Sequence, residues 1–217
     1  MHFPGSKSTS IRSAALLLSL AAALELAGCT REQPFVVYDT PATATLPRHW
    51  EVPDFSFTER SGQSIGRADL LGKVWLADFF YTTCPGPCPM MASRLSALHE
   101  KLAGKDDVRL VSISLDPEKD TPEVLQQYAA RFKAGPNWLF LTGDKTATYQ
   151  FAQKGLKLAV ADVRNSPEPI THSTKLFLVD RSGTVRGFYE GVGEDQSTRL
   201  LADIDRLLAE TGSGNGK

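Results

Sequence analysis

Two cysteines separated by three residues are the side chains most able to do chemistry in this chain of 217 residues. Cys84 and Cys88 lie in the segment FFYTTCPGPCPMM, residues 79–91, directly after an apolar run. A thiolate is both a nucleophile and a soft metal ligand. The pair could therefore form a structural disulfide, a redox couple or two arms of a metal site.

Local geometry favours reactive thiols. If a helix begins near Pro85, Cys84 and Cys88 lie four residues apart on one face of its first turn. Backbone N–H groups and the helix dipole at that end favour thiolate over thiol. The three prolines of the segment remove N–H donors and stiffen the loop, so the pair is held in a defined place.

The spacing favours a metal. Thioredoxin-type redox motifs have two residues between their cysteines, whereas three let the sulfurs open around a soft ion. Two cysteines are too few for an ordinary zinc site or an iron–sulfur cluster, while copper accepts few ligands, with an imidazole as the third. A metal-free thiol–disulfide couple stays open as the alternative. A peroxidase of the peroxiredoxin type is disfavoured because FFYTTC has no proline placed before the reactive cysteine.

The elements that position the cysteines follow from hydrophobic periodicity and turn residues. Lys73–Tyr81 is an apolar, aromatic run typical of a buried central strand, and Met90–Leu102 has helical spacing. The remaining predicted elements are a hairpin within 53–66, strands at 108–115, 138–141 and 156–163, a hairpin over 175–189, and helices at 121–132, 146–154 and 197–210. Strands alternate with helices, so we expect an α/β fold with a central mixed sheet flanked by helices.

A third ligand is predicted at His172. The order of elements resembles the thioredoxin fold, with an N-terminal β-hairpin and an insert before the histidine-bearing loop. In that fold the loop before the strand at 175–180 normally holds a cis-proline that faces the dithiol. Thr171-His172-Ser173 stands there instead, so we expect His172 to point at the sulfurs. His99, in the helix after the cysteines, is expected to be a surface residue.

Three motifs together resemble the Sco/SenC family of copper proteins: TTCPGPCPMM, SISLDPEKDTPEVL and THSTKLFLVDRSG, within about Pro53 to Leu208. The resemblance implies a thioredoxin-like, membrane-tethered protein that binds copper, Cu(I) or Cu(II), through Cys84, Cys88 and His172. It also implies a copper chaperone, a thiol–disulfide reductase, or both, for the binuclear CuA site of cytochrome c oxidase, rather than a turnover enzyme.

Two aspartates follow the strand at 108–115. Asp116 falls on the acidic position of this family, where it is predicted to orient the metal ligands without binding the metal itself. The alternative is that Asp116 only shapes the turn. Asp120 is expected to do no more than shape that turn and cap the helix that begins after Thr121.

The N-terminal region is predicted to be an export signal. Lys7 and Arg12 precede a short apolar core, Ala14–Leu24, and the LAGC at 26–29 resembles the bacterial lipobox. That resemblance implies cleavage before Cys29 and a diacylglycerol on its sulfur. The predicted organisation is a signal peptide at 1–28, a lipid-anchored tether at 29–50, a thioredoxin-like copper-binding domain at 51–211 and a disordered tail at 212–217.

Composition limits the partners. Hydrophobic content of 41% and charged content of 23% are ordinary for a globular protein, and the net charge of −1 without a long basic run argues against nucleic-acid binding. We expect an exported monomer, anchored by lipid on the periplasmic or outer side of the bacterial cytoplasmic membrane, or on an outer membrane. The expected partner is the CuA subunit of cytochrome c oxidase or another copper protein.

Overall fold

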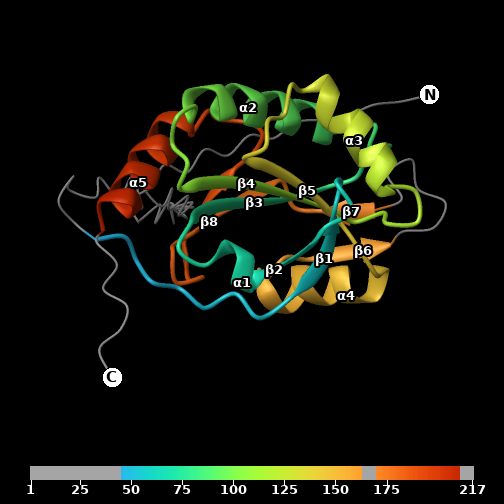
Figure 1. Ribbon diagram of the computed structural model, residues 1–217, viewed down its shortest axis with the longest axis horizontal. Coiled ribbons are helices and arrows are strands. Elements are labelled where there is room, and N and C mark those ends of the chain that lie inside the picture. The colour runs from blue at the N-terminus through green and yellow to red at the C-terminus, as the bar shows by residue number, and fades with distance from the viewer. Residues whose placement is uncertain (1–44, 163–169, 211–217) are drawn as a thin grey trace, which may run out of the picture. The chain divides into compact units, whose positions relative to one another are not determined.

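A mixed β-sheet forms the centre of the protein. The computed structural model describes residues 45–162 and 170–210. Within them, seven strands form one sheet in the order β2-β1-β5-β4-β3-β8-β9, and β6 and β7 form a separate ribbon (Figure 1). The strands are β1 Ser56–Glu59, β2 Ser64–Gly66, β3 Val74–Phe80, β4 Val108–Ser114, β5 Trp138–Thr142, β6 Val160–Asp162, β7 Ile170–His172, β8 Lys175–Val179 and β9 Val185–Glu190.

The strand that leads to the cysteines is the most enclosed element. All seven residues of β3 are buried, which explains its apolar sequence because both faces of the strand are covered. β3 pairs in parallel with β4 on one side and antiparallel with β8 on the other. The predicted central strand is therefore confirmed, and β3 carries the cysteine loop out of the middle of the sheet.

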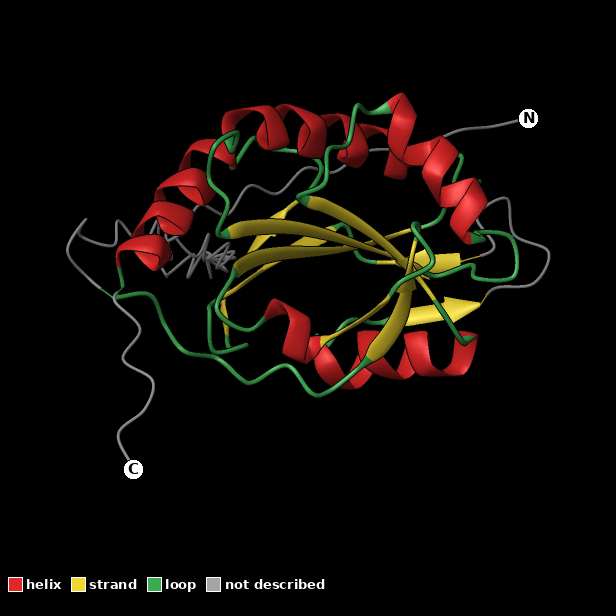
Figure 2. Ribbon diagram, viewed as in Figure 1, coloured by secondary structure: helices red, strands yellow, loops and turns green. Residues whose placement is uncertain are grey.

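Helices cover both faces of the sheet. In Figures 1 and 2, α2, α3 and α5 lie on one face and α1 and α4 on the other. The bounds are α1 Arg67–Leu70, α2 Cys88–Lys101, α3 Pro122–Arg131, α4 Lys145–Gln150, a π-helical turn Phe151–Gly155, and α5 Ser197–Ala209. The predicted α/β class, the flanked mixed sheet, the N-terminal hairpin β1–β2 and the thioredoxin-like arrangement are confirmed.

The insert before the histidine differs from the expectation. Ile170–His172 was expected to be loop, but it forms β7 and pairs antiparallel with β6, with Val160 opposite His172. These two short strands thus satisfy backbone groups on each other and stay separate from the main sheet. His172 ends a strand, three residues before Lys175 begins β8.

The segment before residue 51 is partly packed on the domain. Leu46 is buried, the His49 N–H donates to the Val185 carbonyl at 2.9 Å, and the Arg186 guanidinium donates to the Leu46 carbonyl at 2.7 Å. The predicted signal peptide, Cys29 and the tail after residue 211 lie outside the described residues.

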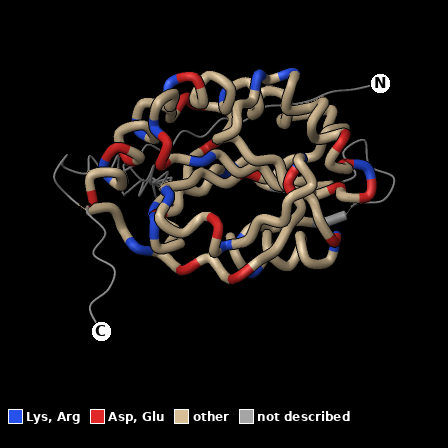
Figure 3. The backbone as a smooth tube through the Cα atoms, viewed as in Figure 1, with Lys and Arg blue, Asp and Glu red and all other residues tan. Residues whose placement is uncertain are grey.

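Surface charge and membrane-spanning potential are both unremarkable in the described chain. Acidic and basic residues are interspersed along its backbone (Figure 3). In the same residues, no helix combines the length and the apolar character needed to cross a bilayer.

Candidate functional site

Cys84 is carried by a turn at the end of β3. The Cys84 N–H donates to the Tyr81 carbonyl at 3.2 Å, so residues 81–84 form a closed turn. Helix α2 begins only at Cys88, with Pro87 as its N-cap, and not near Pro85 as the sequence suggested. A proline disfavours helical backbone in the residue before it, which acts here on Cys84 and on residue 86. The two cysteines therefore belong to different elements and do not share a helix face.

The two sulfur atoms are close together and shielded from solvent. Cys84 is 7% exposed and Cys88 is 1% exposed, and neither forms a disulfide. Burial raises the pKa of the Cys88 thiol, and a hydrogen bond between it and the Cys84 thiol raises that pKa further. The expected stabilisation of a thiolate by the helix N-terminus is thus outweighed at Cys88, because burial disfavours the charged form.

A buried carboxyl group lies in β3 itself, ahead of the cysteines. Asp78 is 3% exposed and accepts a hydrogen bond from the Ser112 hydroxyl at 2.5 Å. The Trp138 indole N–H donates to the same hydroxyl at 2.9 Å. Burial raises the pKa of Asp78 to about 7 despite the Ser112 hydrogen bond, and the Asp78 charge in turn raises the pKa of Cys88.

Tyr128 brings a second buried polar group toward the cysteines. Its ring, on α3, packs 5.2 Å from Phe80 and 6.1 Å from Phe140 between centroids. Its hydroxyl makes no hydrogen bond with any described residue. Burial raises the pKa of Tyr128, and the charge of Cys88 raises it further.

Asp120 binds the cysteine turn. It is fully buried, and its carboxylate accepts from the Thr82 N–H at 3.1 Å, the Thr82 hydroxyl at 2.5 Å and the Ser114 hydroxyl at 2.5 Å. The expectation that Asp120 caps α3 is wrong, because the N-cap is Thr121, whose own hydroxyl accepts from the Val124 N–H.

Asp116 faces a different partner. It is 4% exposed, its carboxylate pairs with Lys119 at 2.8 Å, and its N–H donates to the Ser114 hydroxyl at 3.0 Å. Its role in orienting the metal ligands stays a prediction.

His172 approaches the same edge of the sheet by topology. β8 runs antiparallel to β3, with Trp75 opposite Val179 and Ala77 opposite Phe177. The start of β8 consequently lies beside the end of β3 from which the cysteine loop leaves. The backbone of His172 is at that edge, and its side chain lies outside the described part of the structure.

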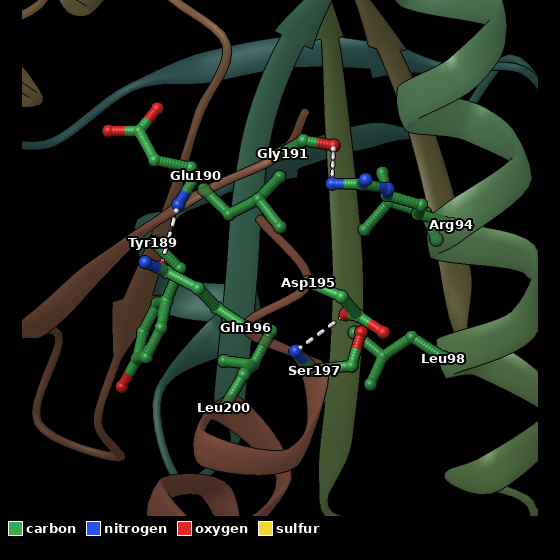
Figure 4. A pocket seen from close by; sticks show the side chains of 11 residues that line it. Arg94, Leu98, Tyr189, Glu190, Gly191, Asp195, Gln196, Ser197 and Leu200 are labelled. Carbon is green, nitrogen blue, oxygen red and sulfur yellow. Dashed lines mark hydrogen bonds between the residues drawn. The ribbon is translucent and has the colours of Figure 1, made fainter. Parts of the chain in front are cut away.

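The cysteine helix is also tied to the segment that follows His172. The Arg94 guanidinium, from α2, donates to the Gly191 carbonyl at 3.2 Å (Figure 4). It also donates to the Gly193 carbonyl at 2.6 Å. The Gly191 N–H donates to the Thr174 carbonyl at 2.8 Å. A Cβ atom at residue 191 would lie 2.5 Å from that carbonyl oxygen and 3.0 Å from the Met91 Cε atom, so only glycine fits without displacement.

The described side chains contain no group of three or more His, Cys, Asp or Glu residues placed to hold a metal ion. Of the three predicted metal ligands, only the two cysteines have side chains in the described part of the structure. Sequence reasoning missed Asp78 and the contacts of Asp120. A carboxylate inside the apolar run KVWLADFFY was a visible signal for Asp78, whereas nothing local connects Asp120 to Thr82.

Comparison with known proteins gives consistent matches. A family model described as SCO1/SenC matches residues 43–209. A SCO1/SenC family lipoprotein from Bacillus anthracis str. Ames is 32% identical, with a TM-score of 0.69 and coverage of 73% of this chain and 95% of that one. BsSco, a member of the Sco family of cytochrome c oxidase assembly proteins with an identified disulfide switch, is 32% identical, with a TM-score of 0.69 and coverage of 77% and 100%. ScoI of Bradyrhizobium japonicum with copper bound is 25% identical, with a TM-score of 0.63 and coverage of 72% and 99%.

Proposed function

This chain belongs to the SCO1/SenC family, and on that premise we propose that it binds one copper ion through Cys84, Cys88 and His172. We further propose that it serves as a metallochaperone in assembly of the CuA site of cytochrome c oxidase. The observation that carries the proposal is the pair of adjacent, buried thiols at the sheet edge that the backbone of His172 also reaches. Thiolate and imidazole are donors that suit copper. The copper-bound ScoI relative and the role of the Sco family in oxidase assembly support the same conclusion.

The proposal is tested by titrating the reduced protein with Cu(II) and recording thiolate-to-copper charge-transfer absorption. The parent should bind one equivalent. His172→Ala should weaken Cu(II) binding strongly and leave formation of the Cys84–Cys88 disulfide unchanged. His99→Ala is a matched control, because His99 packs on Trp138 toward the other end of α2. If His172→Ala bound both copper oxidation states as tightly as the parent, the three-ligand site would be refuted.

A second function, reduction of a partner disulfide, is favoured by the contact between the two sulfurs and by their unequal burial. Cys84, the more exposed, would attack as thiolate and form a mixed disulfide, releasing one partner thiolate that takes up a proton. Cys88, after losing its proton, would then attack the Cys84 sulfur and release the second partner thiolate, which is protonated in turn. The partner gains two electrons and this chain becomes a disulfide.

The two functions separate in one assay. A soluble CuA domain with oxidised cysteines is mixed with each variant, and mixed disulfides are detected by mass. Cys88→Ser should trap the mixed disulfide and Cys84→Ser should not, whereas His172→Ala should reduce the domain at the parent rate. Absence of any mixed disulfide with Cys88→Ser would leave copper delivery as the function.

The third part of the proposal is the anchor. We infer that the chain is exported and held at a membrane by a lipid on Cys29, supported by the LAGC segment and by the lipoprotein relative from Bacillus anthracis. Cys29→Ser should move the protein from the membrane fraction to the soluble fraction of a bacterial extract. A protein that stays with the membrane and carries no lipid by mass would contradict the inference.

A further inference from the structure

We propose that Asp120 is a positioning residue that sets the geometry of the two sulfurs by holding the turn that carries Cys84. This inference rests on the function proposed for the cysteines and adds a residue to their site. The hydrogen bonds of Asp120 reach the cysteine turn through Thr82, which lies two residues before Cys84, so Asp120 acts through Thr82.

The contacts of Asp120 connect two chain segments that are remote in sequence. Thr82 follows β3, while Ser114 is the last residue of β4 and pairs with Phe80 in the parallel register. One carboxylate accepts hydrogen bonds from both segments, two from Thr82 and one from Ser114. The Asp120 N–H donates to the Asp116 carbonyl at 2.9 Å, which fixes the position of the aspartate itself. The ends of the two central strands are thus bound to each other just before the cysteine loop begins.

The hold on Thr82 is directional. Both its backbone N–H and its side-chain hydroxyl donate to Asp120, so neither the peptide plane nor the side chain can rotate without breaking a hydrogen bond. Thr82 is the second residue of the turn closed by the Cys84 N–H and the Tyr81 carbonyl. Its orientation therefore sets the direction in which Cys84 leaves the strand, and with it the separation of Cys84 from Cys88.

The site requires a carboxylate. All three groups that face the side chain of Asp120 are donors, and an ionised carboxylate is purely an acceptor. Asparagine has the same size but would turn an NH₂ group toward one of these donors. Capping of α3 does not explain this aspartate, because the Thr121 hydroxyl already caps that helix. Both oxygens of Asp120 accept hydrogen bonds from other groups.

The test compares Asp120→Asn with the parent in two measurements on the full-length reduced protein. The first is the dithiol–disulfide equilibrium in glutathione buffers, which needs no metal. The second is the energy and intensity of the charge-transfer absorption on titration with Cu(II). We expect the equilibrium constant to change at least tenfold, equivalent to about 30 mV, and the absorption band to shift. Thr82→Val, which keeps the N–H and loses the hydroxyl, should give a smaller change, and Thr82→Ser should restore parent behaviour.

A matched control is available in Asp203, a carboxylate that is also buried and accepts hydrogen bonds from Tyr189 and Arg206 on the α5 side of the domain. Asp203→Asn should alter neither measurement. A folded Asp120→Asn protein with the parent equilibrium and the parent band would overturn the proposal, even if its unfolding free energy were lower. If Asp120→Asn does not fold, Thr82→Val decides by the same two measurements. Loss of the copper band in the parent itself would instead refute the proposed copper function, while the equilibrium would still test Asp120.

Discussion

Asp78 makes the stability of this protein dependent on pH, and the substitution Asp78→Asn should remove that dependence. The carboxyl group is buried in the centre of the sheet, its one described hydrogen bond comes from the Ser112 hydroxyl, and burial raises its pKa from 3.8 to about 7. Asparagine keeps the shape and the oxygen that accepts from Ser112, but it cannot ionise. The difference in unfolding free energy between variant and parent therefore measures how much ionisation of the buried Asp78 carboxyl group destabilises the folded protein.

The magnitude and sign follow from the two pKa values. Below about pH 4 the carboxyl group is protonated in both states, so it adds no pH dependence. Between pH 4 and 7 the unfolded chain ionises while the folded protein keeps its proton, so rising pH favours unfolding. Above pH 7 both states are ionised and the loss is complete. A pKa difference of about 3 corresponds to about 4 kcal/mol, which is an upper estimate of the advantage that Asp78→Asn gains between pH 4 and 7.5.

The assay is urea unfolding of the reduced, metal-free proteins at several pH values from 4 to 8. Cys88 stays protonated over this range because its pKa is raised by burial, so its titration does not mix with that of Asp78. Asp180→Asn is a control whose titration falls outside this range. Burial alone would raise the pKa of Asp180, but hydrogen bonds led by that from Ser182 lower it below 3.8, so the difference in unfolding free energy between this variant and the parent should stay nearly constant from pH 4 to 8. A difference between Asp78→Asn and parent that stays constant from pH 4 to 8 would refute the reasoning.

Three further substitutions probe the scaffold. Gly191→Ala should lower the unfolding free energy by roughly 1–3 kcal/mol, because its Cβ atom would press on the Thr174 carbonyl oxygen; an unchanged urea midpoint would contradict this. Thr121→Ala should lower the unfolding free energy by about 1 kcal/mol through loss of the α3 N-cap, while serine at that position should be neutral in the same urea titration. Arg186→Ala should expose the segment around Leu46 to limited proteolysis, because the guanidinium holds that carbonyl; protection equal to the parent would show that other contacts suffice.

Much of the fold could be predicted because the signals are local. β3 is a continuous apolar run that both faces of a covered sheet require, and the sequence shows this directly. The hairpin β1–β2 and helix α3 have turn residues and an N-cap within a few positions. The resemblance in three motifs then supplied the family, which the matching family model confirms.

The site was harder to predict because its geometry depends on distant contacts. The hydrogen bonds from Thr82 to Asp120 join residues 38 apart in sequence, and no periodicity reports them. The raised pKa of Cys88 depends on burial by the whole domain, whereas the sequence shows only a helix N-terminus that would lower it. The absence of helix at Cys84 and at residue 86 was accessible in principle, since a proline follows each of them, although Cys88 also precedes a proline and is helical.

The late start of α2 changes how the spacing of the cysteines is understood. Cys88 is fixed by the first turn of a helix, and Cys84 by a turn that Asp120 binds to the ends of two strands. Residues 85–87 between them lie outside helix and strand, and the helical hydrogen bonds begin only with that from the Met91 N–H to the Pro87 carbonyl, so this short segment is where a change in sulfur separation can be absorbed. A pair on one helix face would have its separation set by helix geometry alone. Here a hydrogen bond joins the two thiols, and opening of residues 85–87 would let the sulfurs separate around the proposed ion without unwinding α2. One loop can therefore serve both of the proposed functions, copper binding and thiol–disulfide exchange, and the supports on either side would determine how far it opens.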